Sequence, residues 1–444
     1  MQRLTSNALI PMNDHEKGAT DDVRMRGFAH RQTVEAALAW LDAQLEPLSA
    51  ELLPLQATAG RVLASPLASE VDVPGFDRAT MDGYAVAAES TEGATPYNGL
   101  PLVVIGESLP GRPFHASVRV GQAVRIMTGA PLPVGCDAVL PAEWVENPAA
   151  TAAPETVAPE AKPDARSEWT ITALGPVSPG KHVGRLGEDI GRGTTLFQTG
   201  RVLRPQDLGV LSSVGISEVR VFRKPQVRLV VTGNELLPSG SRPHGCHIVD
   251  ANGPMLAAFV ERDGGLVDFP GLVRDEHDAI LDALHAAADV VIVSGGSSVG
   301  IEDLAPTLLA QHGELAVHGI AMRPSSPTGF GRLGHRIVFL LPGNPVSCLC
   351  AYDFFAGRAI RALGGRTKAW PYRPIRARLT RKISSPIGRL DYARVQVVEG
   401  AVEPLAVGGA SVLSSTTRAD GFVIVPADSE GFAPGTEVEV WLYA

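Results

Sequence analysis

Three glycine-rich loops with polar side chains each follow an apolar run in the second half of the chain. The longest is VIVSGGSSVGIED at residues 291–303, and the others are TGNE at 232–235 and LPGNP at 341–345. Glycines let the backbone approach a ligand and leave amide N–H groups free to face an anion. Glu302 and Asp303 add hard oxygen donors of the kind that hold magnesium beside a phosphate. Together the loops predict a site for an anionic ligand.

Each loop residue also has a purely structural interpretation. Glu235 can belong to a simple turn, Asn252 can be the N-cap of the next helix, and Asp275 can be an ordinary acid of a first helical turn. The two prolines of 341–345 can stiffen a strand-to-helix turn in which Pro345 is the first helical residue. The same rigidity would keep a backbone-lined pocket in shape. Both interpretations stay open for each residue alone, and only their common placement favours a site.

That placement follows from the pattern of residues 205 to about 366, where strand and helix signals alternate. The alternation is typical of a mostly parallel, doubly wound sheet, which binds ligands at the carboxyl ends of its strands. All three loops are expected at that edge. The predicted strands are 227–231, 266–269, 289–293 and 336–341, and the predicted helices are 254–262, 275–287, 303–312 and 346–363.

Short helices and strands are predicted in the first part of the chain. A helix is expected after Thr33, which is a plausible cap, and a second short helix is expected over 57–63. Short strands are expected beyond Pro74, among them 102–105 and 123–126. The first helix is predicted because apolar residues share one face, namely Val34, Leu38, Leu41 and Leu45.

Two later segments differ in composition. Residues 147–167 are rich in Ala, Pro and Glu and nearly lack large apolar side chains, so they predict a mobile loop or linker. From Pro371 onward, short alternating runs separated by Gly and Pro predict a small separate β-barrel or sandwich.

Length and charge narrow the functional classes. At 444 residues the chain is too long for one ordinary core, so several domains are expected. Its 39 basic and 48 acidic residues give a formal net charge of −9 without a basic stripe, which argues against nucleic-acid binding. No apolar run is long enough to span a membrane, and the polar N-terminus lacks the apolar part of a secretory signal. The four cysteines lack zinc-type spacing and are expected to be reduced thiols, so we expect a cytoplasmic protein.

Two segments of the first half carry acids and a hydroxyl without a familiar catalytic order. PGFDRATMDGYAV at 74–86 contains Asp77 and Asp82, and RIMTGAPLP at 125–133 contains Thr128. The sequence has no Ser/His/Asp order, no HExxH and no Walker lysine motif, which disfavours proteolysis and P-loop hydrolysis.

Six motifs together resemble one family. PGFDRATMDGYAV, RIMTGAPLPVGCDAV, GEDI, VVTGNEL, SGGSSVGIED and LPGNPVS, in this order and at this spacing, are similar to those of the molybdopterin molybdenumtransferase family (MoeA type), to which the gephyrin E-domain is related. The resemblance runs from about His30 to the C-terminus.

The resemblance implies a multidomain α/β plus β protein of elongated shape. A disordered lead (1–27) would precede a discontinuous linker domain (28–75 and 168–204). Three further domains are implied. They are an inserted β-rich domain (76–167, with 147–167 as a flexible loop), a doubly wound parallel α/β domain that binds molybdopterin (205–366) and a C-terminal β-barrel domain (367–444). It also implies a homodimer whose active cleft lies between subunits.

The implied reaction inserts molybdate into adenylylated molybdopterin, uses Mg²⁺ and releases AMP. Candidate protein partners are a molybdopterin adenylyltransferase and a client molybdoenzyme. The family motifs place catalytic acids at Asp189, Glu235, Asp275 and Asp303, of which the last three would also be metal ligands. They place ligand-binding residues at Asp82, Thr128, Gly295, Gly296, Ser298, Arg323, Ser326, Pro342, Gly343, Asn344 and Pro345.

Several positions depart from the family pattern. RPSSP at 323–327 stands where a lysine-rich KPGKP-type segment is usual, so that Ser325 replaces the glycine and Ser326 the second lysine. Losing one charge-assisted contact to an anion would cost ~1.5–3 kcal/mol. Further departures are Asn234, Gly253 and Ser297.

These departures leave two functions open. The first is the molybdenum insertase, and the alternative is a catalytically weakened paralogue that binds molybdopterin or the molybdenum cofactor and carries it to a client enzyme. A scaffold of the gephyrin kind has little support, because no accessory scaffold domain is expected before His30.

Overall fold

The computed structural model describes residues 31–146, 169–296, 304–406 and 409–443. The predicted lead 1–27, the whole predicted loop 147–167, and the residues Ser298, Glu302 and Asp303 lie outside the described residues. The chain divides into two compact units, one formed by Met1–Ala50 with Phe222–Ala444 and one formed by Glu51–Val221.

The first unit contains the predicted α/β sheet. It has seven strands in the order β16-β13-β18-β22-β21-β19, with β17 beside β13. The strands nearest the predicted loops are parallel, whereas β21 and β19 add an antiparallel edge that the sequence pattern did not predict. The bounds are β13 (Gln226–Thr232), β16 (Leu266–Asp268), β17 (Leu272–Val273), β18 (Val290–Ser294), β19 (Glu314–His318), β21 (Gly329–Leu333) and β22 (Arg336–Leu341).

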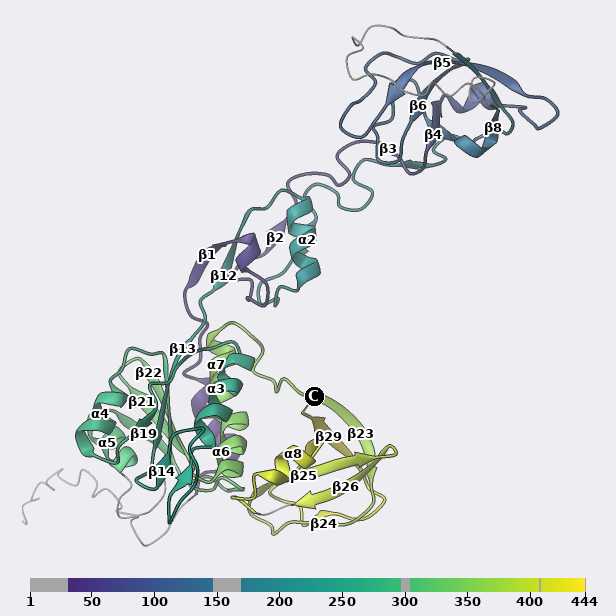
Figure 1. Ribbon diagram of the computed structural model, residues 1–444. Helices are drawn as coiled ribbons and strands as arrows, with labels where there is room; N and C mark the ends of the chain where they lie inside the picture. Colours follow the sequence, from purple (N-terminus) through teal and green to yellow (C-terminus); the bar gives the residue numbers. More distant parts are fainter. Residues whose placement is uncertain (1–30, 147–168, 297–303, 407–408, 444) are drawn as a thin grey trace, which may run out of the picture. The chain divides into compact units, whose positions relative to one another are not determined.

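Helices cover both faces of this sheet, as the doubly wound pattern predicts (Figure 1). Alternate residues of β18 point to opposite sides: Val290 and Ile292 pack with α3, α6 and α7, whereas Val291 and Val293 pack with α4 and α5. The helices are α1 (Val34–Asp42), α3 (Asn252–Arg262), α4 (His277–Leu284), α5 (Leu304–His312), α6 (Pro345–Ala351) and α7 (Gly357–Leu363), with a π-helical turn at Tyr352–Ala356 joining the last two.

The first predicted helix is confirmed, and its cap is the predicted one. The Thr33 hydroxyl oxygen accepts a hydrogen bond from the backbone N–H of Ala36 at 3.2 Å. The predicted helix over 57–63 is wrong. Only a 3₁₀ turn, η1 (Leu55–Ala57), forms there, because the following backbone bonds a neighbouring segment: Leu63 N–H donates to the carbonyl of Arg201 at 2.9 Å.

The C-terminal part of the first unit is a β-barrel, not a sandwich. The strands follow the order β25-β26-β23-β29-β27, and β27 pairs again with β25 to close the ring around an apolar core. The short strand β20 (Met322–Arg323) joins β25 in parallel and ties the barrel to the α/β region. The other bounds are β23 (Arg373–Leu379), β24 (Ile383–Ser384), β25 (Leu390–Val398), β26 (Ala401–Ala406), α8 (Ser414–Arg418), β27 (Gly421–Val425), β28 (Gly431–Phe432) and β29 (Glu437–Leu442).

The second unit is rich in strands. Its main sheet has six strands in the order β7-β4-β6-β5-β9-β8, and two apolar clusters pack against it. The predicted strands 102–105 and 123–126 lie inside β5 and β6. The bounds are β4 (Gly83–Val86), β5 (Leu100–Ser108), β6 (Gln122–Ile126), β7 (Ala138–Pro141), β8 (Val145–Glu146) and β9 (Trp169–Ala173).

A smaller apolar cluster of the same unit surrounds Leu63, Leu211 and Val219. It is built from α2 (Pro205–Ser213) and several short strands. These are β1 (Ala50–Pro54), β2 (Leu67–Ala68), β11 (Thr195–Phe197) and β12 (Glu218–Phe222), while β3 (Arg78–Ala79) pairs with β10 (Val183–Gly184). Within the described part of the chain, no helix has the length and apolar character needed to cross a membrane.

Candidate functional site

The strand register brings the predicted loops together at one edge of the α/β sheet. Thr232 at the end of β13 pairs with Val273, and its neighbour Val231 pairs with Ser294 at the end of β18. Ser294 in turn pairs with Leu341 at the end of β22. The loops that follow these strands therefore begin side by side, although they are far apart in the sequence.

Two of these loops approach each other so closely that glycine is required. Gly295 has φ +100°, and a Cβ atom there would lie 2.1 Å from the carbonyl oxygen of Thr232. A Cβ atom at Gly343 would lie 3.6 Å from the Cα of Gly295. The Gly295 N–H donates to the carbonyl of Leu341 at 3.3 Å, which joins the loops after β18 and β22.

Asn252 braces this edge and leaves one polar atom without a partner. Its side-chain Nδ2 donates to the Ser294 hydroxyl at 2.9 Å and to the Gly343 carbonyl at 2.7 Å. A carbonyl only accepts, so the amide nitrogen must face Gly343 and the oxygen must point elsewhere. That Oδ1 is buried and has no hydrogen-bond partner, and the residue is only 7% exposed. An unsatisfied buried acceptor is costly, and in a native structure it points to a missing donor.

The simple N-cap interpretation of Asn252 is wrong. Asn252 is the first residue of α3, and the N-cap position belongs to Ala251. Asp250 caps the helix instead, because its Oδ1 accepts a hydrogen bond from Gly253 N–H at 2.9 Å. Sterics explain why residue 253 is a glycine. A Cβ atom there would lie 2.3 Å from Asp250 Oδ2 and 2.6 Å from the ring of Phe269.

The acid Asp275 does not open a helix, contrary to the prediction of a helix over 275–287. Helix α4 begins only at His277, and the Asp275 carboxylate accepts a hydrogen bond from the hydroxyl of Thr232. This contact places a half-buried carboxylate at the end of β13. Glu235 follows the same strand and is exposed, with its backbone carbonyl accepting from Ile248 N–H at 3.0 Å.

The donor chemistry of this edge suits a hard cation in part. Magnesium prefers carboxylate oxygens and keeps several of its waters, and the carboxylates Glu235 and Asp275 follow the paired strands β13 and β17. No cluster of three or more His, Cys, Asp or Glu side chains that could hold a metal occurs among the described residues. The third predicted ligand, Asp303, lies outside them.

The thiol of Cys348, next to the sheet edge, is unreactive. Cys348 on α6 lies with its Sγ 3.6 Å from the Ser294 hydroxyl. Burial raises the pKa of Cys348 to about 12, so this thiol stays protonated near neutral pH. The first residue of the same helix is Pro345, as the sequence predicts.

The RPSSP segment serves the junction between the sheet and the barrel. The Arg323 guanidinium makes a two-pronged ion pair with Asp391, whose side chain is fully buried. Ser325 has φ +91°, a backbone conformation that suits the glycine usual in the family, and its hydroxyl donates to the Ser347 carbonyl at 2.5 Å. The Ser326 hydroxyl is buried and has no hydrogen-bond partner.

The remaining predicted site residues belong to the second unit. Asp82 accepts two hydrogen bonds from Thr128, one from its N–H and one from its hydroxyl, each at 2.7 Å. The backbone N–H and then the hydroxyl of Thr128 hold the pKa of Asp82 below its usual value. Asp189 is exposed, and its N–H donates to the carbonyl of Val73 at 3.1 Å.

The structure thus groups the predicted residues into three places. Arg323 and Ser326 lie in the RPSSP segment, and Asp82 and Thr128 form one contact in the second unit. The loops at the sheet edge contain Asp275, Gly295, Gly296, Pro342, Gly343, Asn344 and Pro345. Sequence analysis missed the bracing role of Asn252 and the contribution of Ser294. A polar residue that ends an apolar strand was the available signal for Ser294.

Three family models match the chain in succession. The MoeA N-terminal region (domain I and II) matches residues 32–215, a probable molybdopterin binding domain matches 228–362, and the MoeA C-terminal region (domain IV) matches 376–443.

Known proteins resemble the chain over nearly its whole length. "Molybdopterin molybdenumtransferase 2" of Mycobacterium tuberculosis is 33% identical over 402 residues, which cover 88% of this chain and 94% of the relative. "Molybdopterin molybdenumtransferase" of Haemophilus influenzae is 32% identical over 403 residues, with coverage of 89% and 94%. The crystal structure of a molybdopterin biosynthesis MoeA protein from Pyrococcus horikosii has a TM-score of 0.77 and 34% identity, and the match covers 94% of this chain and 100% of that one.

Proposed function

Since this chain belongs to the molybdopterin molybdenumtransferase family (MoeA type), which supports a role in molybdenum cofactor biosynthesis, we propose that it is a molybdenum insertase. The proposed reaction inserts molybdate into adenylylated molybdopterin and releases AMP. We place this reaction in the cytoplasm, where the product would pass to a client molybdoenzyme and a molybdopterin adenylyltransferase would supply the substrate.

The observation that carries the proposal is the unsatisfied Oδ1 of Asn252 at the carboxyl edge of the α/β sheet. The pterin ring system presents N–H donors, and such a donor would satisfy the buried acceptor. A site built to hydrogen-bond a ligand N–H discriminates strongly against molecules that lack it, because the buried group is then left unpaired. The surrounding glycine loops would allow a flat ligand to lie close to the backbone.

The acids at the same edge would handle the phosphate part of the substrate. Asp275 and Glu235, together with Asp303, would hold Mg²⁺, and the bound cation would neutralise charge on the phosphoanhydride. Backbone N–H groups of Gly296 and Asn344 are proposed to face the anion. The Thr232 hydroxyl would keep the Asp275 carboxylate in place through the hydrogen bond it already donates.

The second unit would contribute across a homodimer. Asp82, Thr128 and Asp189 are proposed to complete the active site of the other subunit. The two Thr128 hydrogen bonds hold the Asp82 carboxylate in one orientation, which would preorganise it for a ligand.

Molybdate-dependent AMP release from adenylylated molybdopterin, with Mg²⁺ present, tests the proposal directly. Purified protein is expected to release AMP well above a blank without enzyme. No release above that blank at saturating substrate would overturn the insertase.

A second candidate function is the carrier of molybdopterin or finished cofactor. It is favoured by the RPSSP segment, where the Arg323 cation is occupied by Asp391 and Ser326 offers a hydroxyl without charge. Comparing the wild type with Ser326→Lys in the same assay separates the two functions. Robust wild-type release supports the insertase, whereas silence that Ser326→Lys relieves supports a carrier that lost catalysis at this position.

A further inference from the structure

A pair of histidines lies across a tight turn in the loop between β14 (Leu236–Leu237) and β15 (Ile248–Val249). His244 and His247 face each other in an antiparallel bridge, and the N–H of His247 donates to the carbonyl of His244 at 2.9 Å. Between them Gly245 has φ +57°, the positive φ that a tight two-residue turn of this kind needs. The turn therefore fixes the spacing of the two histidines.

The two imidazole rings lie at a separation that suits one shared metal ion. Residues that face each other in an antiparallel pair direct their side chains to the same side. The ring centroids of His244 and His247 are 5.1 Å apart, and the ring planes meet at 44°. A metal ion lies about 2.0 Å from each imidazole nitrogen that binds it, so two rings that share one ion have centroids about 5 Å apart.

The rest of the fold does not use either ring. Both histidines are exposed, and within the described part of the chain their side chains have no hydrogen bond or ion pair and contact only each other as rings. Histidine is the commonest metal ligand in proteins, with a ring nitrogen as the donor. The nitrogens of this pair are therefore available to an ion from solvent.

A second histidine pair of the same unit differs in geometry. His285 follows α4 and His312 ends α5, and their rings meet edge-on at 86° with centroids 6.1 Å apart. The Nδ1 of His285 already bonds the carbonyl of Leu281 at 2.9 Å. This pair is more widely spaced and partly engaged, so it serves as a matched comparison for the first pair.

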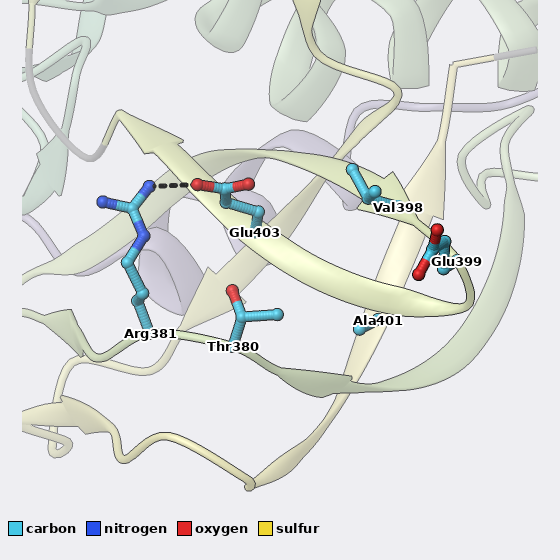
Figure 2. Close-up of a pocket in the computed structure, with 6 residues that line it drawn as sticks. All are labelled: Thr380, Arg381, Val398, Glu399, Ala401 and Glu403. Carbon is cyan, nitrogen blue, oxygen red and sulfur yellow. Dashed lines mark hydrogen bonds and ion pairs between the residues drawn. The ribbon is translucent and has the colours of Figure 1, made fainter.

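Carboxylates in a pocket of the barrel offer a different donor chemistry (Figure 2). Glu399 and Glu403 line this pocket, and Arg381 makes an ion pair with Glu403 at 2.7 Å. Carboxylate oxygens suit hard ions such as Mg²⁺, and the guanidinium repels a cation. An ion that prefers nitrogen is therefore expected to bind at the histidine pair and not in this pocket.

We infer that His244 and His247 bind one divalent transition-metal ion of the nickel, copper or zinc class. Imidazole nitrogen suits these ions, whereas Mg²⁺ prefers oxygen. Water would complete the coordination, because no group of three His, Cys, Asp or Glu side chains that could hold a metal occurs among the residues that the structure describes. The loop is tied to Glu235, whose carbonyl accepts from Ile248 N–H at 3.0 Å, so a bound ion would stiffen a loop that carries a predicted acid.

Calorimetric titration of the untagged full chain with Ni²⁺, in a large excess of Mg²⁺, tests this inference. The wild type is expected to bind Ni²⁺ despite the Mg²⁺. His244→Asn and His247→Asn should each weaken Ni²⁺ binding about tenfold or more, because the second imidazole no longer acts at high effective concentration. In NMR spectra, paramagnetic Ni²⁺ should broaden the ring signals of these two histidines before those of the others.

Three control variants make the result specific. His285→Asn changes the other histidine pair, Glu399→Gln changes the barrel pocket, and Cys246→Ser removes the exposed thiol between the two ligands. Each should leave the Ni²⁺ affinity within about threefold of wild type.

Three results would overturn the inference. They are an absence of Ni²⁺ binding, displacement of Ni²⁺ by Mg²⁺, and a loss in any control variant as large as that in His244→Asn. The titration contains no molybdopterin and AMP release is assayed separately, so failure here would leave the proposed insertase intact.

Discussion

The sequence motifs mark two polar regions as functional. These regions differ in whether their buried polar atoms all have hydrogen-bond partners within the protein. In the second unit, the Asp82 carboxylate is exposed to solvent and accepts two hydrogen bonds from Thr128 at its Oδ1. At the edge of the α/β sheet, Asn252 donates hydrogen bonds to Ser294 and to Gly343, and its buried Oδ1 has no hydrogen-bond partner. The first region therefore has no buried polar atom without a partner, whereas the second has one that a ligand could satisfy.

The difference has an energetic meaning. Leaving a buried acceptor unsatisfied costs about 1–3 kcal/mol, which folding must tolerate until a ligand supplies the donor. The unsatisfied acceptor lowers the stability of the protein without ligand and raises its affinity for a ligand that supplies the donor. Substitutions at the sheet edge should therefore change ligand affinity, and substitutions at the Asp82–Thr128 contact should also change the titration of Asp82 in the protein without ligand.

The largest effect is expected from Asp275→Asn. Asparagine keeps an oxygen that can accept from the Thr232 hydroxyl but loses the charge that a cation or a developing charge requires. AMP release should fall about a hundredfold or more, while the melting temperature should change little. The matched control is Asp278→Asn, an acid of the first turn of α4 whose side chain is 95% exposed. Equal losses in both variants, or a large drop in melting temperature, would mark Asp275 as structural.

A smaller effect is expected from Asn252→Ala. The variant removes the orphan acceptor, so molybdopterin binding should weaken about tenfold or more. Stability should change by only about 1 kcal/mol, because two hydrogen bonds are lost together with one unsatisfied oxygen. Ser294→Ala tests the brace alone, since Asn252 still donates to Gly343, and its binding should stay within about threefold of wild type. Fluorescence titration with molybdopterin measures both, and an unchanged affinity in Asn252→Ala would remove the acceptor from the site.

The smallest effect is expected from Thr128→Ala. It removes the hydroxyl donor and keeps the N–H donor, so the depressed pKa of Asp82 should rise part of the way to its usual value. A carboxylate with a depressed pKa stabilises the fold above its usual pKa, and that stabilisation is lost as the pH falls through the folded-state pKa. The acid-sensitive part of stability should therefore shrink in the variant. Carboxyl-carbon NMR titration checks this, with Thr128→Ser as the control that retains the hydroxyl, and an unmoved Asp82 titration in Thr128→Ala would contradict it.

Much of the architecture was predictable from local patterns. The helix after Thr33, the strands 227–231 and 336–341 and the barrel beyond Pro371 all follow from periodicity and turn residues, which depend on near neighbours in the chain. The error at 57–63 arose because that segment bonds Arg201 and Leu203, distant partners that no local pattern reveals. The domain boundaries, and the roles of Asp189, Glu235 and Asp303, stay predictions.

By itself, the sequence determined the element types, the glycine loops at strand ends and the family, because these reside in short motifs and their order. Only the tertiary structure decided which polar atoms find partners. Asn252 meets Ser294 across 42 residues and Gly343 across 91, and Arg323 meets Asp391 across 68. Hydrogen-bond satisfaction depends on distances of about 3 Å between such remote atoms, which strand register and helix packing set. For that reason the orphan acceptor of Asn252 became visible only in the folded chain.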